Sequence, residues 1–280
     1  MIMSWLAALP LALWRGLGVV LGVALWLFAW RRRRVVGVNL ALCFAHTSRP
    51  RRAWWSLMVM VHFAQTWLDR VWLWHASPAL LAKRLTVHGE LGASGAQVYL
   101  APHFMGLDAG WTALTRSQPE RRMATIYAPQ SMAWLNQWMT RGRGRFGQPT
   151  LFTKRGQLRE VVRWLRQGGA LYLLPDLDVG ARDAVFVDFM GVPTATATVL
   201  PRLVALTGAT VRPVLTRLTC QGYAVHVLPP MTLSGDADVV SATQYMNHAI
   251  AQWVAQHPTQ YWWVHRRFKT RPAGQPSPYR

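Results

Sequence analysis

The feature that most constrains this chain is a long apolar run near its N-terminus, followed at once by a cluster of positive charge. Residues 6–30 are almost purely apolar, interrupted by Arg15, and four consecutive arginines occupy positions 31–34. About 20 helical residues cross a hydrocarbon core of about 30 Å, so the run is long enough to span a bilayer if Arg15 lies near one end or snorkels. A secretory signal peptide carries its charge before the apolar run. The pattern predicts an uncleaved membrane anchor over residues 1–34, with the arginines on the cytoplasmic side. A buried core helix and a helix lying in one leaflet are the alternatives.

The overall charge favours an anionic lipid surface as the partner. Lys and Arg number 31 against 11 Asp and Glu, a net charge of +20, while 51% of the residues are hydrophobic. Such a balance suits nucleic acid or anionic lipid head groups. Because the chain also has an apolar run and 16 Trp, which collect at membrane interfaces, we expect membrane binding and no nucleic acid. The two cysteines are far apart and the histidines are scattered singly, so we expect no disulfide framework and no metal site.

Beyond the anchor, the pattern alternates between short apolar runs and helical periodicity. Residues 35–83 read as helical, and helices are also expected near residues 158–165 and 238–256. Five runs read as buried strands: residues 97–101, 123–127, 170–174, 211–215 and 223–228. Strand–helix alternation predicts one α/β domain over residues 35–271, with a mostly parallel sheet flanked by helices. Residues 272–280 are expected to be a loose tail.

Polar residues that could carry chemistry follow three of these strands. His103 and Asp108 follow the first strand, and Asp176 follows the third. The helix after the second strand ends in three arginines, at positions 141, 143 and 145. In open α/β sheets, sites form just past the carboxyl ends of the strands, so these residues converge if the strands are neighbours.

His103 and Asp108 suit base catalysis under one geometric condition. Neutral imidazole accepts a proton near pH 7, and a carboxylate fixes its tautomer and stabilises the imidazolium. Five residues of straight helix turn by about 500°, so the pair meets only if His103 lies in the turn before a helix and Asp108 in its first turns. The sequence has no nucleophile motif, which suggests that the base activates a substrate hydroxyl. The arginines would hold anionic groups or an oxyanion. A structural His–Asp hydrogen bond and a solvated basic face are the alternatives.

The H-x4-D spacing is the signature of glycerolipid-type acyltransferases, and the neighbouring words narrow the resemblance. The chain resembles the late (secondary) acyltransferases of lipid A biosynthesis, the lauroyl/myristoyl group of the lysophospholipid acyltransferase superfamily. The likeness extends over nearly the whole chain, and its most specific words are PDLDVG at 175–180, TATAT at 194–198 and YWWVHRRFKTRP at 261–272.

The resemblance implies a role for each candidate residue. His103 is expected to be the general base and Asp108 its orienting partner, although the family often has Glu at the second position. Arg143 resembles the family's essential arginine, and Asp176 its second conserved acid. We place Arg143, Asp176 and Arg145 together as substrate-binding or oxyanion residues.

The reaction implied by the resemblance transfers an acyl chain from acyl carrier protein to a hydroxyl of a 3-hydroxyacyl chain on a Kdo-bearing lipid A precursor. No metal or cofactor is expected. The enzyme would sit at the bacterial inner membrane, held by a single N-terminal anchor, with its catalytic domain on the cytoplasmic side. A charge of +20 would attract both the acidic carrier and the anionic glycolipid.

Three other functions remain open at this point. A lysophosphatidate acyltransferase shares H-x4-D but should carry an FPEGTR-like word, which is absent. A phosphatidylinositol mannoside acyltransferase resembles this group. The third is a catalytically inactive protein that binds membrane or nucleic acid, and the intact His103, Asp108, Arg143 and Asp176 argue against it.

Two sets of side chains near these motifs have open roles. Four apolar residues after the first strand could line an acyl pocket or be plain core: Phe104, Met105, Leu107 and Trp111. In the C-terminal word, we expect the tryptophans to pack and Arg266, Arg267 and Lys269 to bind lipid phosphates.

Overall fold

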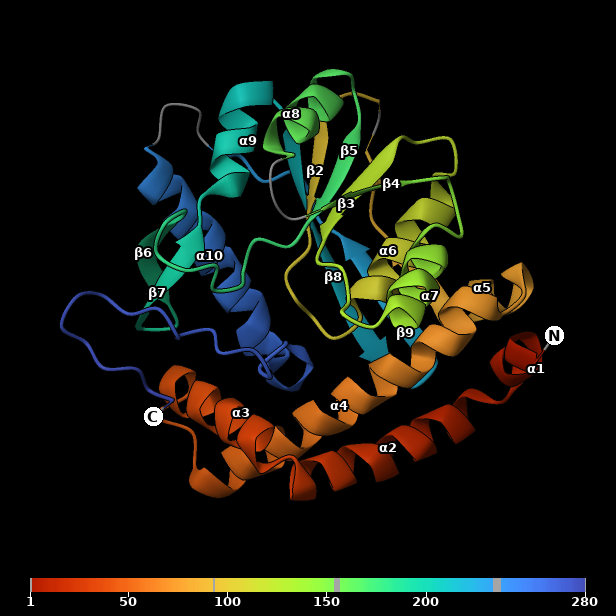
Figure 1. Cartoon of the computed structure of the whole chain (residues 1–280), viewed down its shortest axis with the longest axis horizontal. Helices are drawn as coiled ribbons and strands as arrows, with labels where there is room; N and C mark the ends of the chain where they lie inside the picture. Colours follow the sequence, from red (N-terminus) through yellow and green to blue (C-terminus); the bar gives the residue numbers. More distant parts are fainter. Residues whose placement is uncertain (1, 93, 154–156, 234–237, 280) are drawn as a thin grey trace.

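The computed structural model describes residues 2–92, 94–153, 157–233 and 238–279. Helices form the N-terminal third and alternate with strands afterwards (Figure 1). The helices are α1 (Ile2–Ala8), α2 (Leu11–Phe28), α3 (Trp30–Cys43), α4 (Arg49–His75), α5 (Pro78–Arg84), α6 (Leu107–Ser117), α7 (Ala133–Arg143), α8 (Leu158–Arg166), α9 (Val199–Thr207), α10 (Val239–Gln256) and the 3-10 turn η1 (Pro258–Gln260).

The strands form one large sheet and a separate hairpin. They are β1 (Leu85–His88), β2 (Gln97–Leu100), β3 (Met123–Tyr127), β4 (Thr150–Thr153), β5 (Ala170–Leu173), β6 (Ala184–Phe189), β7 (Val192–Ala197), β8 (Thr210–Thr219) and β9 (Gly222–Val227). The seven-stranded sheet has the order β1-β9-β8-β2-β5-β3-β4, and β6 pairs with β7. Within the large sheet, every neighbouring pair is parallel except β8–β9, so the expected α/β class is confirmed.

All five expected strands are present, and four strands were not foreseen. β1 and β4 have four residues each, too few for a periodic signal. β6 and β7 form an antiparallel hairpin that turns at Met190 and Gly191, both with positive φ. The segment expected to be helical over 35–83 contains α4, the end of α3 and most of α5, separated by short turns.

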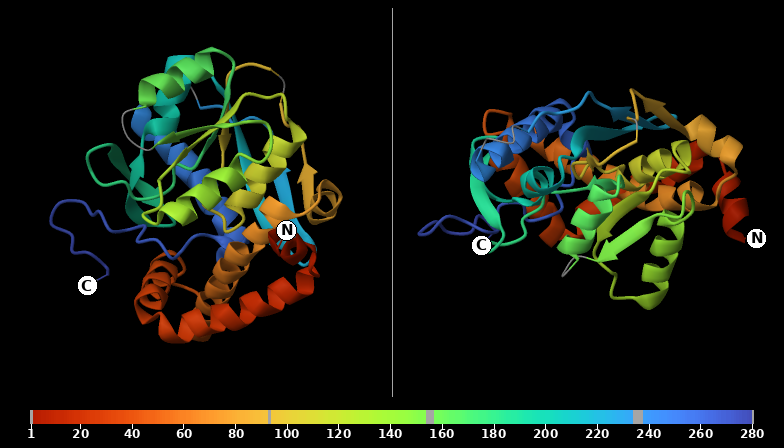
Figure 2. Two further views of the ribbon diagram at one scale, coloured as in Figure 1. Left: turned by 45° about the vertical axis from the view of Figure 1, so that its right-hand side comes forward. Right: turned by 90° about the horizontal axis from the view of Figure 1, so that it is seen from above.

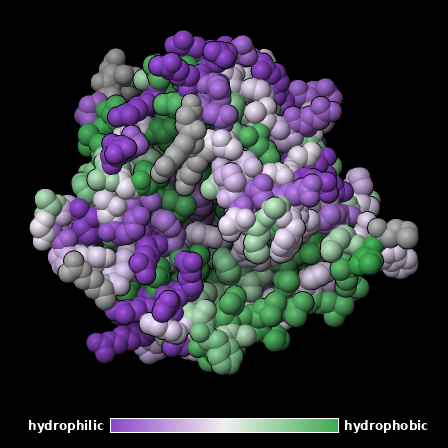
Figure 3. Space-filling model, viewed as in Figure 1, coloured by the Kyte–Doolittle hydropathy of each residue, from purple (hydrophilic) through white to green (hydrophobic). Residues whose placement is uncertain are grey.

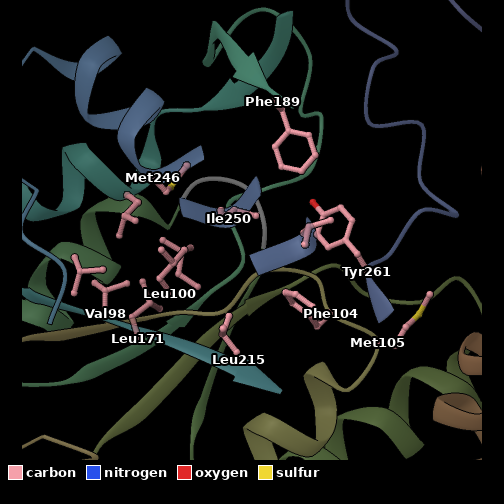
Figure 4. Close-up of a cluster of buried hydrophobic side chains, with 14 of the residues drawn as sticks. Val98, Leu100, Phe104, Met105, Leu171, Phe189, Leu215, Met246, Ile250 and Tyr261 are labelled. Carbon is pink, nitrogen blue, oxygen red and sulfur yellow. The ribbon is translucent and has the colours of Figure 1, made fainter. Parts of the chain in front are cut away.

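The central strands are buried on both faces. Val98 and Leu100 of β2 face α8, α9 and α10, and Figure 4 shows them opposite Met246 and Ile250 of α10. The alternate residues Tyr99 and Ala101 belong to the second core layer, with side chains from α4 and α6. Alternation of side chains across a strand thus gives each strand two apolar partners, which explains why the strands read as continuous apolar runs.

The N-terminal helices pack against this domain. α2 runs beside α4 in both views of the molecule (Figure 1, Figure 2) and makes its most extensive contacts with that helix. Among the described residues, α2 is the one helix whose length and hydropathy suit a membrane span. The four arginines are helical, because α3 begins at Trp30.

The C-terminal tail is less loose than expected. It has no helix or strand over its described residues, but Tyr279 packs against the main core. The Tyr279 hydroxyl accepts a hydrogen bond from the backbone N–H of Phe268 (3.0 Å) and donates one to Asn39 of α3. One aromatic residue therefore fastens the tail to the N-terminal helices.

Candidate active site

The pairing of β2 with β5 brings His103 to Asp176. The two strands are parallel, and their last residues, Leu100 and Leu173, are in register. His103 and Asp176 each lie three residues beyond that pair, so both loops leave the same edge of the sheet at the same level. The expected convergence of these residues at one sheet edge is confirmed.

Asp176 holds His103 through both of its oxygens. Oδ1 lies 2.7 Å from Nδ1 of the imidazole, and Oδ2 accepts the backbone N–H of His103 at 2.9 Å. The Tyr261 hydroxyl donates to Oδ2 at 2.7 Å. Burial alone would raise the pKa of Asp176, but the adjacent imidazole and these hydrogen bonds outweigh it and hold the pKa at about 2. Asp176 is therefore a buried acceptor that is ionised at neutral pH.

This contact defines the tautomer of His103. An ionised carboxylate only accepts hydrogen bonds, so Nδ1 must carry the proton that is shared with Asp176. Nε2 then holds the lone pair and is the nitrogen that can act as a base. The His103 side chain remains 15% exposed, while Asp176 is fully buried. A partly exposed histidine with an ionised carboxylate behind it suits general base catalysis.

The loop that carries His103 is fixed by the C-terminal segment. The backbone N–H of Trp262 donates to the carbonyl of His103 (2.9 Å), and that of Met105 donates to the carbonyl of Gln260 (2.7 Å). Phe104 and Tyr261 pair as an isolated antiparallel bridge between the two segments. These bonds place both His103 and the Tyr261 hydroxyl against Asp176.

Asp108 binds two arginines. Its Oδ2 accepts a hydrogen bond from Nε of Arg70 at 2.8 Å, and its Oδ1 accepts one from Nε of Arg143 at 2.9 Å. Burial would raise the pKa of Asp108, but the two guanidinium groups outweigh it and lower the pKa to about 2. The Asp108 carboxylate thus joins the start of α6 to the C-terminal parts of α4 and α7 through its ion pairs with Arg70 and Arg143.

The expected role of Asp108 requires a correction. The backbone condition is met, since His103 lies in the turn before α6 and Asp108 is the second residue of that helix. Among the residues that the structure describes, however, Asp176 and not Asp108 is the carboxylate bonded to the His103 ring. The physical reason is that Arg70 and Arg143 take both oxygens of Asp108. We assign Asp176 as the orienting partner and Asp108 as the group that positions the arginines.

The three arginines at the end of α7 do not act as one cluster. Arg143 bonds Asp108, and its carbonyl accepts the indole N–H of Trp111 at 2.9 Å. Arg145 instead donates to the carbonyls of Leu73 (3.0 Å) and Ala76 at the end of α4. Since these helix-end carbonyls need donors, the Arg145 guanidinium caps the end of α4 and does not share the Asp108 contact of Arg143.

The apolar residues after β2 are core side chains in this structure. Phe104, Met105 and Trp111 are each at most 3% exposed. Figure 4 shows Phe104 and Met105 near Tyr261, within the same buried cluster. The sequence left an acyl pocket and plain core open for them, and their burial favours the core.

The C-terminal cations also differ from one another. Arg267 is buried and donates to the carbonyl of Ala195 and to side chains of Thr196 and Asn247. The prediction that Arg267 binds lipid phosphates is therefore wrong, because its donors hold the β6–β7 hairpin and α10. Arg266 and Lys269 are exposed. Trp263 is fully buried, as expected for a packing residue.

Two residues of the site escaped sequence reasoning. Tyr261 opens the C-terminal aromatic motif, in which we assigned roles to the tryptophans and the cations but none to the tyrosine. Arg70 stands in an apolar helix and lies 4.0 Å from the Trp67 ring centroid. A charged residue within so apolar a segment was a signal that could have indicated a buried ion pair.

The site therefore consists of a histidine held by a buried, ionised aspartate at the carboxyl edge of a mostly parallel α/β sheet, an arrangement that suits the class of enzymes with a general base. Comparison with known proteins narrows this class. A family model for bacterial lipid A biosynthesis acyltransferases matches residues 1–270. The chain is 31% identical over 278 residues to the lipid A biosynthesis palmitoleoyltransferase of Escherichia coli (strain K12), covering 94% of this chain and 87% of that one.

Two further relatives come from the same organism. The lipid A biosynthesis lauroyltransferase is 29% identical over 293 residues, covering 98% of this chain and 92% of the relative. The lipid A biosynthesis myristoyltransferase is 27% identical over 262 residues, covering 89% and 78%. The chain therefore belongs to the bacterial lipid A biosynthesis acyltransferase family, and the resemblance drawn from its motifs is confirmed. Membership supports a role as a late acyltransferase in lipopolysaccharide synthesis.

Proposed function

We propose that this protein transfers a fatty acyl chain from acyl carrier protein to the hydroxyl of a 3-hydroxyacyl chain on a Kdo-bearing lipid A precursor. The observation that carries the proposal is the bond between His103 Nδ1 and the buried, ionised Asp176, in a chain of the lipid A acyltransferase family. The reaction needs a base for an alcohol, and this pair supplies one. No metal or cofactor takes part in the proposed reaction.

The proposed chemistry is a direct transfer. Nε2 of His103 removes the proton from the acceptor hydroxyl, and the oxygen attacks the thioester carbonyl carbon. The tetrahedral intermediate collapses with cleavage of the carbon–sulfur bond, and the imidazolium returns its proton to the departing phosphopantetheine thiolate. Asp176 stabilises the imidazolium between these two steps. The products are the acylated glycolipid and the free carrier thiol.

Arg143 is the cation that we propose for the anionic substrate. Its Nε is bound to Asp108, and no other bond of its guanidinium is found within the described residues. Its side chain keeps 13% of its surface exposed, so the two terminal nitrogens remain available to a phosphate or carboxylate. Asp108, which is itself bound by Arg70, holds that guanidinium from behind.

The balance of charge supports the proposed partners and location. A chain with 31 Lys and Arg against 11 Asp and Glu attracts an acidic carrier protein and an anionic glycolipid. We place the enzyme at the bacterial inner membrane with its catalytic domain on the cytoplasmic side. An apolar N-terminal helix followed by four arginines supports this placement.

Acyl transfer by the purified full-length chain in detergent tests the proposal. The substrates are acyl carrier protein loaded with acyl chains of several lengths and a Kdo-bearing lipid A precursor, with lysophosphatidate as the competing acceptor. We expect one added acyl chain on the lipid A precursor, no product on lysophosphatidate, and loss of transfer in His103→Ala. Product on lysophosphatidate alone would overturn the proposed acceptor, and full transfer by His103→Ala would overturn the proposed base.

A further inference from the structure

The position of α2 on the catalytic domain decides how the chain meets the membrane. Two glycines one helical turn apart, Gly18 and Gly22, are buried against α4. A Cβ on Gly18 would lie 2.4 Å from Cγ of Gln65, and a Cβ on Gly22 would lie 2.3 Å from Cα of Val61. Such close approach of two helix backbones requires glycine, and it ties the middle of α2 to α4.

A buried ion pair fixes the start of α2 to the same domain. The Arg15 guanidinium lies 3.2 Å from Oδ2 of Asp69 in α4 and donates to the carbonyl of Gly222 at the start of β9. Asp69 is fully buried and also accepts hydrogen bonds from Trp72 and Tyr223. Separation of α2 from the domain would leave this carboxylate without its cation, which is a strongly unfavourable state for a buried charge.

The opposite face of the N-terminal helices is apolar and uncovered. Thirteen large apolar side chains within residues 1–54 are exposed: Ile2, Met3, Trp5, Leu9, Leu13, Leu17, Val19, Val20, Leu21, Leu27, Phe28, Trp30 and Trp54. Figure 3 shows the apolar surface along the edge of the molecule that α1 and α2 form, with a hydrophilic patch at one end. A continuous apolar face of this extent is typical of a surface that binds another protein or a membrane.

The positive charge of the N-terminal segment favours a lipid membrane as the partner of this face. The first 68 residues contain eight arginines and no Asp or Glu. Arg31 and Arg32, at the end of the apolar face, are exposed. Apolar side chains bordered by cations fit hydrocarbon chains beneath anionic head groups.

We propose that α1 and α2 lie in the plane of the membrane, embedded in the cytoplasmic leaflet alone, as a fixed part of the catalytic domain. A helix that crossed the bilayer would have to leave α4 or carry α4 with it. α4 buries Asp69 and Arg70 and contacts η1, which holds the loop of His103. The in-plane arrangement keeps every one of these contacts and resolves the choice between a spanning anchor and a helix in one leaflet.

The side of the membrane on which the N-terminus lies tests the proposal. A short hydrophilic N-terminal extension with one cysteine is added in a Cys43→Ala background, and the exposed native Cys220 marks the catalytic domain. A membrane-impermeant maleimide is applied to inverted inner-membrane vesicles and to spheroplasts. We expect both cysteines to react in inverted vesicles and neither in spheroplasts. Reaction of the extension in spheroplasts alone would overturn the proposal, because α2 would then cross the bilayer.

A cross-link tests the contact between α2 and α4 within the membrane. An ideal Cβ at Gly18 lies 3.2 Å from Cβ of Gln65, within a few tenths of an ångström of the roughly 3.5–4.5 Å of a disulfide. We expect Gly18→Cys with Gln65→Cys to form a disulfide in membranes, in a background without native cysteines. Val20→Cys, on the exposed face, should not cross-link to Gln65→Cys. Equal cross-linking of both pairs, or of neither, would contradict the fixed packing.

Vesicle flotation distinguishes lipid from a protein partner. The purified chain should float with vesicles of phosphatidylglycerol and phosphatidylethanolamine. Failure to float would overturn lipid as the occupant of the face. The choice of the cytoplasmic leaflet rests on the proposed function. None of these three measurements needs acyl transfer, so the in-plane position of the helices and the proposed reaction can each fail without the other.

Discussion

Replacement of Asp176 by Asn tests the assignment of the histidine's partner most sharply. Asn keeps the shape of Asp, and its amide oxygen can take the place of Oδ2, which accepts the backbone N–H of His103. Its amide group would then face Nδ1 as a donor. The ring is pushed toward the tautomer with its proton on Nε2, and in that form Nε2 cannot act as the base.

The expected loss follows from the electrostatics of the pair. The pKa of Asp176 falls from 3.8 to about 2. At roughly 1.4 kcal/mol per pKa unit, the imidazole and the hydrogen bonds from the His103 backbone and Tyr261 together outweigh burial by about 2 kcal/mol. Loss of support of that order for the imidazolium would slow transfer roughly 30-fold. Loss of the correct tautomer adds to this, and the equivalent change in a Ser-His-Asp triad costs about 10⁴ in kcat. We expect kcat to fall between about 30-fold and 10⁴-fold, with KM nearly unchanged.

Steady-state acyl transfer with saturating carrier thioester measures this loss, and Asp178→Asn is the matched control. Asp178 lies in the same loop but bonds Gly180 and Thr270, not the histidine. It should keep kcat within a few-fold of the wild-type value. If Asp176→Asn retained kcat while Asp108→Asn abolished it at unchanged stability, the original pairing of His103 with Asp108 would be right and ours would be refuted.

Three further predictions concern the arginine triad, acid stability and helix packing. Asp108→Asn leaves the buried Arg70 and the partly buried Arg143 without a counter-ion and should lower the free energy of unfolding by about 3–5 kcal/mol, measured as a lower denaturant midpoint. The pKa values of Asp108 and Asp176 are both lowered to about 2, so the two carboxylates stabilise the fold fully above their unfolded pKa of 3.8. We expect this stabilisation to be lost as pH falls from about 4 to 2. An unfolding midpoint that did not change over this range would contradict the prediction. Gly142→Ala places a Cβ 2.1 Å from the ring of Trp74 and should lower the thermal midpoint, whereas Gly144→Ala, whose nearest neighbour would be 3.2 Å away, should change it little.

The fold could be predicted where apolar runs are long and buried on both faces. β2, β3 and β5 read clearly for this reason, and their loops correctly indicated the site edge. Short β1 and β4 gave no periodic signal.

The sequence predicted which residues form the site better than it predicted which of them bond one another. His103 and Asp108 are neighbours in sequence, which suggested a pair. The direction of a buried carboxylate depends on distant partners, here Arg70 and Arg143, which sequence spacing does not reveal. In the same way, composition indicated an apolar helix at α2, but the contacts of Arg15, Gly18 and Gly22 with α4 are needed to show which face is covered by protein.

Mass spectrometry of lipid A from cells that lack this protein tests the central claim most directly. The deletion strain is complemented with the wild-type chain, with His103→Ala and with Asp178→Asn, at matched membrane abundance. We predict that lipid A of the deletion strain lacks one acyl chain and that the wild-type chain and Asp178→Asn restore it, while His103→Ala does not. Restoration by His103→Ala, or a lipid A that never changes with this protein, would contradict a His103-dependent acyl transfer to lipid A.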